Sequence, residues 1–316
     1  MSSTVGHRDD AELESPRVQE VSDGVFAYIQ PHGTWFINNT GFLVGSTGVA
    51  SVDACSTERR TRAYLEAIAA TSPQPVRTLI NTHHHGDHTH GNYLFGGATI
   101  VAQERCREEV LAFGLPHFPG VFPDVDWGEI RIAPPFLTYS DRVTVYSDDL
   151  RCEVRYVGSP AHTTNDSIVW LPERSVLFAG DLIFNGGTPF MLMGSVAGAI
   201  DVLEQVVKPL SPATIVPGHG DVCGPQAIDD VLGYLRFVLD VARRGRDAGL
   251  SPLEAAMEAG LGEYAGLSDR ERIVGNLHRA YADLDAPAER GGALNVAAVF
   301  GEMVAYNGGK PLHCVA

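Results

Sequence analysis

The sequence predicts an α/β fold with a helical C-terminal extension. Up to about residue 224, strand-like runs alternate with helix-like segments, which is typical of this fold class. Histidine and aspartate residues follow several of these runs, at the sheet edge where open α/β folds place ligand sites. Beyond that point only helix-like segments remain. We therefore predict a flexible segment at 1–18, a mixed domain at 19–224 and a helical extension at 225–316 that packs on it.

The expected strands are short apolar runs, rich in β-branched residues and bounded by turn-forming residues. They lie at 25–30, 41–45, 49–53, 76–82, 98–102, 142–147, 151–157, 167–171, 175–180 and 213–216. The first three are expected to form hairpins, with one loop at 31–39 and a turn at Ser46-Thr47-Gly48.

The expected helices carry apolar residues three and four positions apart. They lie at 57–71, 90–95, 103–112, 195–208, 225–246, 251–259, 268–284 and 293–306. The helix at 225–246 has an apolar face made of Ile228, Val231, Leu232, Leu235 and Leu239. We expect the extension to pack on the mixed domain or to form a homodimer contact.

Four metal-capable side chains lie within six residues, in the pattern His83-x-His85-x-Asp87-His88. They follow the apolar strand at 76–82. Side chains two positions apart point the same way in extended backbone, so His83 and His85 can bind one ion together. Asp87 and His88 come in the following loop, are too crowded to join the same tetrahedral ion, and suit a second one. Imidazole with carboxylate is a ligand set for zinc, iron or manganese.

A site for two ions needs further ligands, and the chain supplies them. His162, Asp181 and His219 each come at the end of a strand-like run or just after it. Taken singly, a His or Asp at a strand end is more often a cap or a turn residue. Together with the four residues at 83–88 they favour a metal site over a solvated, histidine-rich loop.

The ordered motifs His83-x-His85-x-Asp87-His88, His162, Asp181 in Gly-Asp and His219 in Gly-His-Gly resemble the metallo-β-lactamase superfamily. The resemblance covers about residues 20–225 and implies a four-layer αβ/βα sandwich for the mixed domain. It implies one metal held by His83, His85 and His162. A second would be held by Asp87, His88 and His219, with Asp181 bridging the two.

Two positions depart from the family pattern. Asn165 stands where the family often has Gly, and Asn tolerates left-handed backbone better than most residues. Asp181 stands where true β-lactamases have Cys or Ser. The second departure places the chain nearer to glyoxalase II, lactonases and related ester or thioester hydrolases.

The resemblance implies a hydrolase with two Zn²⁺ ions per chain, with iron or manganese as the alternative. A hydroxide that bridges the metals would attack the carbonyl of an ester, thioester, lactone or related small molecule. Asp87 is the candidate to orient the water and to move the proton to the leaving group. Sulfur dioxygenases, which resemble these motifs but use a single iron and a persulfide, are the alternative. A β-lactamase and a non-catalytic binding protein fit the residues less well.

Three polar residues near the candidate ligands, Asp53, His84 and His90, could each have either a role at the site or a purely structural role. Asp53 ends a strand beside the metal strand, where it would orient a ligand His or cap the helix that begins near Ser56. His84 and His90 are candidates for acid groups or for ligand-orienting groups, and a structural role is the alternative favoured by their context.

Aromatic residues and methionines are candidates for the wall of a substrate pocket. Residues 113–137 contain five prolines and several aromatic residues, including Trp127. This excursion is long enough to form a lid or a pocket wall, with a packed surface loop as the alternative. The remaining candidates are Trp35, Phe36, Phe190 and Met191.

The net charge of −16, from 23 basic and 39 acidic residues, narrows the function classes. It disfavours nucleic acid and anionic membrane surfaces as partners, because both bind basic side chains. The five cysteines form no C-x-x-C pair, and neither a signal-peptide core nor a membrane-spanning apolar run is visible. We expect a cytoplasmic enzyme with a small-molecule substrate.

Overall fold

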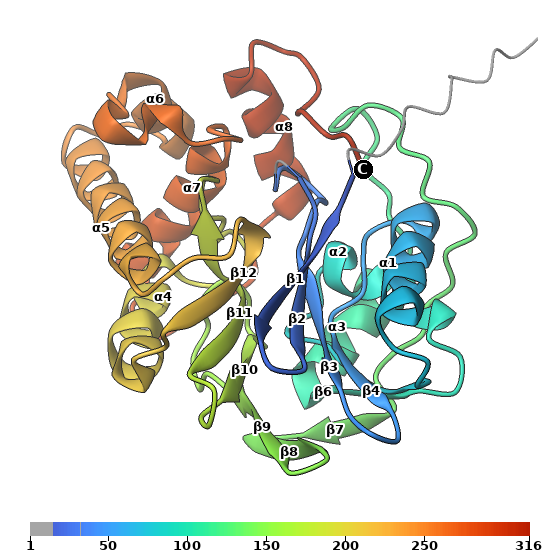
Figure 1. The fold of residues 1–316 in the computed structure, drawn as a ribbon. Coiled ribbons are helices and arrows are strands. Elements are labelled where there is room, and N and C mark those ends of the chain that lie inside the picture. The colour runs from blue at the N-terminus through green and yellow to red at the C-terminus, as the bar shows by residue number, and fades with distance from the viewer. Residues whose placement is uncertain (1–14, 32) are drawn as a thin grey trace, which may run out of the picture.

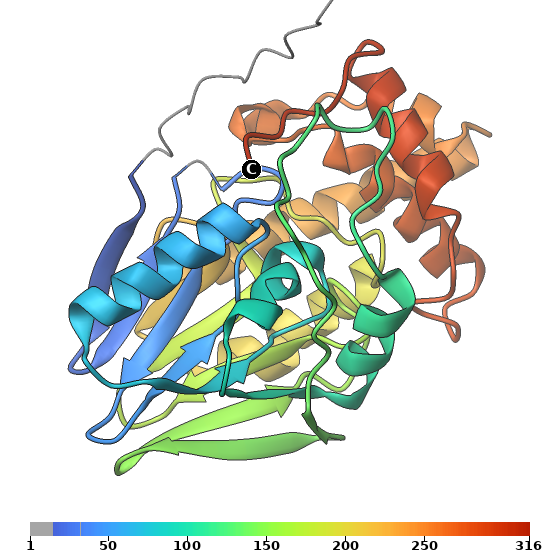
Figure 2. The same cartoon turned by 90° about the vertical axis from the view of Figure 1, so that its right-hand side faces the viewer.

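The computed structural model, which describes residues 15–31 and 33–316, has two sheets packed face to face with helices outside them (Figures 1 and 2). The layers run helix, sheet, sheet, helix, so the predicted four-layer αβ/βα sandwich is confirmed. Each sheet buries one face against the other sheet and one against helices, which is why strands of both read as apolar runs rather than as strict alternation.

The first sheet contains seven strands in chain order. They are β1 (Arg17–Ser22), β2 (Val25–Ile29), β3 (Thr40–Val44), β4 (Val49–Val52), β5 (Val76–Ile80), β6 (Thr99–Gln103) and β7 (Leu137–Tyr139). The first four pair antiparallel, and β4 to β7 pair parallel. Helix α1 (Glu58–Thr71) covers the outer face by packing Tyr64 and Ile68 against Phe42 and Leu79. Helix α3 (Glu104–Phe113) lies beside it.

The second sheet has the order β12-β11-β10-β9-β8. Its strands are β8 (Arg142–Ser147), β9 (Leu150–Tyr156), β10 (Ser167–Leu171), β11 (Val176–Asn185) and β12 (Thr214–Gly220). Only β11 and β12 pair parallel, joined by helix α4 (Val196–Val202), η2 (Leu203–Val207) and η3 (Lys208–Leu210). Between the two sheets lies an aliphatic core that includes Leu43, Ile80, Val154, Val169 and Phe178.

The C-terminal extension packs on the outer face of the second sheet (Figure 1). It consists of α5 (Gln226–Asp247), α6 (Pro252–Glu258), η4 (Gly262–Gly266), α7 (Arg272–Asp285) and α8 (Val296–Tyr306). The five apolar residues that define the predicted face of α5 are all buried. Packing on the sandwich is therefore established, whereas the homodimer contact stays a prediction.

Several elements differ from the sequence prediction. Strands β1 and β7 were not predicted, because both are edge strands whose side chains are mostly at least partly exposed and form no apolar run. Strands β11 and β12 run further than predicted, since their parallel pairing continues through Phe184 opposite His219. The predicted flexible segment falls mostly on residues 1–14, outside the described part of the chain, and Arg17 and Val18 belong to β1.

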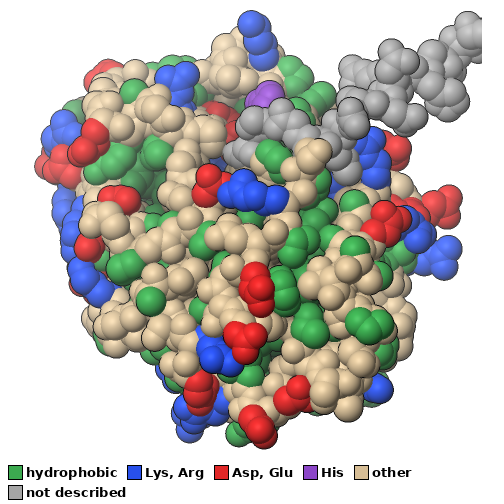
Figure 3. Space-filling model, in the orientation of Figure 1, with side chains coloured by type: hydrophobic (Ala, Val, Ile, Leu, Met, Phe, Trp, Pro, Cys, Tyr) green, Lys and Arg blue, Asp and Glu red, His purple; other side chains and the backbone are tan. Residues whose placement is uncertain are grey.

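The surface carries both signs of charge. On the face shown in Figure 3, acidic and basic side chains alternate, and neither gathers into one large patch. Within the described residues, no helix is long and apolar enough to cross a membrane.

Candidate metal centre

Four segments of the two sheets bring the seven candidate ligands to one edge of the sandwich. His83 and His85 follow β5, and Asp87 and His88 lie in α2 (Gly86–Thr89), which is followed by η1 (His90–Leu94). His162 lies between β9 and β10. His219 lies near the end of β12, as expected for a strand-end residue, whereas Asp181 lies in the middle of β11, because this strand extends past it. Likewise Asp87 and His88 occupy a helical turn and not a loop.

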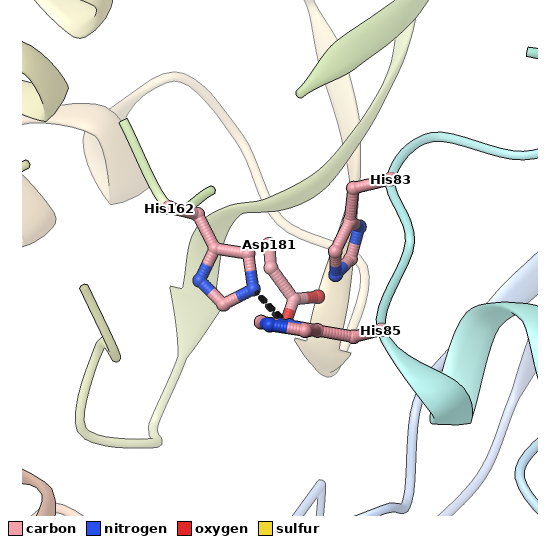
Figure 4. Close-up of side chains that lie close together, drawn as sticks. All are labelled: His83, His85, His162 and Asp181. Carbon is pink, nitrogen blue, oxygen red and sulfur yellow. Dashed lines mark hydrogen bonds and ion pairs between the residues drawn. The ribbon is translucent and has the colours of Figure 1, made fainter. Parts of the chain in front are cut away.

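The first cluster consists of His83, His85, His162 and Asp181, whose nearest ligand atoms all lie within 4.8 Å of one another. Figure 4 shows the three rings and the carboxylate pointing toward one another. His162 Nε2 lies 2.8 Å from His85 Nδ1 and 3.4 Å from Asp181 Oδ2. The cluster is therefore arranged so that one ion could contact four side chains.

The second cluster consists of Asp87, His88, His219 and the same Asp181, again within 4.8 Å. His88 Nε2 lies 3.1 Å from Asp181 Oδ1, while His219 Nε2 lies 3.2 Å from Asp181 Oδ2. His219 Nε2 is also 3.3 Å from Asp87 Oδ2. Asp181 Oδ2 thus lies near His162 of the first cluster and His219 of the second, so this carboxylate stands between the two clusters, as the bridging role requires.

The residues present fit divalent metal ions. Imidazole nitrogens with two carboxylates are the donors that zinc, iron and manganese accept. Nε2 of His83 is buried without a hydrogen-bond partner among the described residues, although buried polar atoms nearly always have one. An ion in the first cluster would satisfy this nitrogen.

Burial and the neighbouring charges set the pKa values of the clustered groups. Burial, reinforced by neighbouring histidines, lowers the pKa of His83 and of His85 well below the usual value, so both rings are neutral and ready to bind metal. Burial acts in the same direction on His219, but the carboxylates of Asp181 and Asp87 raise its pKa to about 9. In the metal-free protein the His219 ring therefore carries a proton at neutral pH. Its positive charge partly replaces the charge that a metal cation would bring to the two carboxylates.

Asp53 orients one of the candidate ligands. Its carboxylate accepts a hydrogen bond from His88 Nδ1 at 2.9 Å and two from Thr82, at 2.7 Å from the backbone N–H and 2.8 Å from the hydroxyl. Helix α1 is capped by Thr57, whose hydroxyl accepts from the Arg60 backbone N–H. Of the two interpretations of Asp53, the structure therefore supports the ligand-orienting one.

The neighbours of His162 and His84 also hold these rings in place. His162 Nδ1 bonds the backbone carbonyl of Phe190, which leaves Nε2 for the cluster. His84 Nδ1 accepts from the Asn165 amide at 3.0 Å, and the Asn165 side-chain oxygen accepts from the His84 backbone N–H. Asn165 does not adopt the left-handed backbone considered for it; it acts through these side-chain bonds. His84 is accordingly structural.

An aromatic-lined cavity opens directly onto the clusters. Asp87, Asp181 and His219 take part in its lining, so a molecule in the cavity would lie against the candidate ligands. Among the predicted pocket residues, Trp35, Phe36 and Phe190 line it. His90 also lines it, packed so closely on Gly86 that a Cβ there would lie 2.1 Å from the ring.

Two predicted pocket residues lie outside the lining. Trp127 packs behind the wall, with its ring centroid 4.9 Å from Phe36 and 5.7 Å from His90. Met191 is fully buried and donates its backbone N–H to Asn276 instead. The segment 113–137 still forms part of the wall, through Phe113 and Phe118.

The sequence interpretation missed three lining residues, namely Phe184, Arg272 and Phe300. Arg272 and Phe300 come from α7 and α8, so the C-terminal extension reaches the cavity. Only one feature of the sequence indicates that Arg272 reaches the cavity: this basic residue falls on the apolar side of an amphipathic helix. His313, near the end of the extension, has an exposed side chain and does not line the cavity.

Comparisons with known proteins agree with this geometry. The family model of the Metallo-beta-lactamase superfamily matches residues 33–219. A hydroxyacylglutathione hydrolase of Rhodospirillum rubrum is 29% identical over 176 residues, 55% of this chain and 58% of that enzyme. A metallo-beta-lactamase type 2 of Bacteroides fragilis is 25% identical over 67% of this chain and 82% of its own. A solved metallo-beta-lactamase from Pontibacter korlensis superposes with a TM-score of 0.59 at 19% identity, covering 70% of this chain and 99% of that one, which shows the shared fold.

Proposed function

Because the chain belongs to the metallo-β-lactamase superfamily, we propose that it is a metal-dependent hydrolase of an ester, thioester, lactone or related small molecule. The observation that carries this proposal is the pair of ligand clusters that share Asp181 and open into one cavity. We propose zinc, two ions per chain, with iron or manganese as the alternative. When bound, two divalent ions make water nucleophilic near neutral pH and polarise a carbonyl group.

The side chains have separate tasks in this proposal. The first ion would be held by His83, His85 and His162, the second would be held by Asp87, His88 and His219, and Asp181 would contribute to both sites. Asp53 keeps the ring of His88 oriented, and the carbonyl of Phe190 does the same for His162. Asp87 both belongs to the second cluster and lines the cavity, so its carboxylate can orient the attacking water.

The proposed reaction consumes one water and needs no further reactant. The water oxygen bonds to the carbonyl carbon, and the bond from that carbon to the leaving oxygen or sulfur breaks. Asp87 passes the proton of the water to the leaving group. The products are a carboxylic acid and an alcohol or thiol.

The named relatives support different substrates. The hydroxyacylglutathione hydrolase supports a thioester, and we favour thioesters and esters for that reason. We do not extend the glutathione moiety to this chain, since Arg272 is the only Arg or Lys among the cavity residues and it is already paired with Asp269. The metallo-beta-lactamase relative supports a β-lactam as the less favoured substrate, because Asp181 stands where those enzymes have Cys or Ser.

Metal identity and stoichiometry, measured on protein purified without added metal, test the proposal first. We expect two zinc ions per chain and turnover of thioesters, esters or lactones. The variant His85→Ala should lose metal and activity while its circular dichroism spectrum stays that of the wild type. One iron per chain, with oxygen uptake on a persulfide and no hydrolysis, would replace the hydrolase by the dioxygenase alternative.

A further inference from the structure

The cavity wall beside the metal centre is built almost entirely from aromatic rings. Phe36, Phe118, Phe190 and Phe300 line it together with Trp35 and Phe184. They come from the β2–β3 loop, the segment after α3, β11 with the loop that follows it, and α8. Four chain segments thus each contribute an aromatic ring to the same wall. An apolar pocket could equally be lined by aliphatic residues, so the rings set this wall apart.

The rings contact one another mainly at tilted and edge-to-face angles. Trp35 meets Phe190 at a centroid distance of 5.0 Å and 76°, and Phe36 meets Phe118 at 5.5 Å and 58°. Aromatic pairs in these orientations attract each other beyond the effect of buried area. A substrate ring that enters the cavity can join this network, whereas a saturated ring of the same size gains only apolar contact.

The one cationic side chain in the wall is already neutralised. Arg272 is almost completely buried, and its guanidinium lies 3.0 Å from the carboxylate of Asp269, which is also buried. The same guanidinium lies over the ring of Trp35 at 4.3 Å. A substrate carboxylate would have to compete with Asp269 for this group in a site that excludes most water.

A second acid next to Arg272 holds the tryptophan of the wall. Glu271 accepts a hydrogen bond from Trp35 Nε1 at 2.7 Å. Asp269 also accepts one from the Thr34 hydroxyl, at 2.5 Å. The turn before α7 therefore fixes Trp35. It also places two acidic side chains, Asp269 and Glu271, beside the one basic side chain of this wall, Arg272. Arg272 Nη1 donates to the backbone carbonyl of Thr188 at 3.0 Å, and its buried Nε–H group has no partner within the described structure.

We infer that the site selects uncharged substrates that carry an aromatic ring, seated against Trp35 and Phe300, which contact each other, with the scissile carbonyl toward the clusters. This inference rests on the proposed hydrolase function for its reaction, but the ring preference is a property of the cavity. The C-terminal extension is a specificity element in this view, because α7 and α8 supply Arg272 and Phe300.

Three thioesters with the same reacting group test the preference. They are S-methyl phenylthioacetate, S-methyl cyclohexylthioacetate and S-methyl (4-carboxyphenyl)thioacetate, with thiol release as the assay. We expect kcat/KM for the phenyl compound to exceed that of the cyclohexyl compound about tenfold, as two additional ring contacts would give. It should exceed that of the carboxyphenyl compound as well, because a carboxylate buried beside the acids of this wall loses its hydration without gaining a free cation. Equal values for the phenyl and cyclohexyl compounds, or a higher value for the carboxylate, would overturn the inference.

Matched variants locate the preference in the wall. Phe300→Leu should reduce the phenyl-to-cyclohexyl ratio to about one, with unchanged metal content. Phe26→Leu, the same change in a ring that stacks on Phe42 away from the cavity, should leave the ratio unchanged. If the Phe300 variant does not fold, the partly exposed Phe118→Leu takes its place, with the same expectation.

Binding separates this inference from the proposed reaction. The three corresponding amides, titrated calorimetrically into the metal-loaded protein, should bind in the same order as the thioesters are cleaved. That order without any thioester cleavage would support the ring preference and reject the hydrolase. Cleavage or binding without any ring preference would reject the inference alone.

Discussion

At the scale of single residues, the centre depends on carboxylates that touch more than one partner. Asp181 faces His162 of the first cluster and His219 of the second, so one side chain joins the two clusters. Asp53 contacts the second cluster through the ring of His88, and its other partner, the Thr82 hydroxyl, lies 3.1 Å from His83 Nδ1 of the first. Its negative charge makes that ring a better ligand and fixes which nitrogen faces the metal.

Replacement of Asp53 by Asn should weaken metal binding without loss of the fold. The Asn side chain keeps the shape of Asp53, but the negative charge opposite His88 Nδ1 is lost. The loss of such a ligand-orienting carboxylate typically lowers metal affinity about 10–100-fold. Competition with a chromophoric chelator measures the affinity. Asp23→Asn, at an exposed site far from the clusters, is the control. Equal affinities for the two variants would show that Asp53 has no role at the centre.

At the scale of elements, the cavity is lined by several separate chain segments that make few contacts of their own with the metal centre. The segment that follows α3 has no helix or strand until β7, yet its aromatic side chains pack tightly. Trp127 supports Phe36 from behind, and Phe36 lines the cavity. Changes in this segment should therefore act on substrate choice and not on metal binding.

The variant Trp127→Ala tests this division of roles. Removal of the ring leaves Phe36 free to move into the space behind it, so the ratio of kcat/KM between two substrates of different shape should change several-fold. Metal content should stay that of the wild type. Phe136→Ala, a change at an exposed ring near the end of the same segment, serves as the control. An unchanged substrate profile would indicate that the segment is a passive surface loop.

At the scale of the whole molecule, the two sheets are joined by one set of polar ligands. The first sheet leads into His83, His85, Asp87 and His88, and the second supplies the other three. Ions bound there would link the two halves of the sandwich across their shared edge. Folding and metal binding should consequently be coupled, because the unfolded chain has no preformed site.

Removal of the metal should lower the melting temperature. A ligand present at about 1,000 times its dissociation constant stabilises the folded state by about 4 kcal/mol, which corresponds to a shift of at least about 5 °C here. Differential scanning calorimetry before and after chelation, with metal analysis of both samples, measures the shift. The His85→Ala variant should respond less, since it begins with less metal. An unchanged melting temperature in metal-free protein would contradict the coupling.

Much of the architecture follows from local patterns in the sequence. Most strands and helices were predicted to within a few residues, because a buried strand or an amphipathic helix leaves its periodicity in consecutive residues. Four of the seven candidate ligands were found for a similar reason, because short spacings such as that of His83 and His85 constrain local geometry. The other three were assigned through their position at strand ends and the family resemblance. Edge strands β1 and β7 have no apolar pattern and so escaped prediction.

The tertiary structure alone decided which distant residues meet. Asp53 could cap a helix or orient a ligand as far as the sequence shows, and only the packing of β4 beside β5 places it against His88. Arg272 and Phe300 lie at least 50 positions beyond the last ligand, His219, yet both line the cavity. Local periodicity carries no information about such contacts, since they arise from the way whole helices pack on the second sheet.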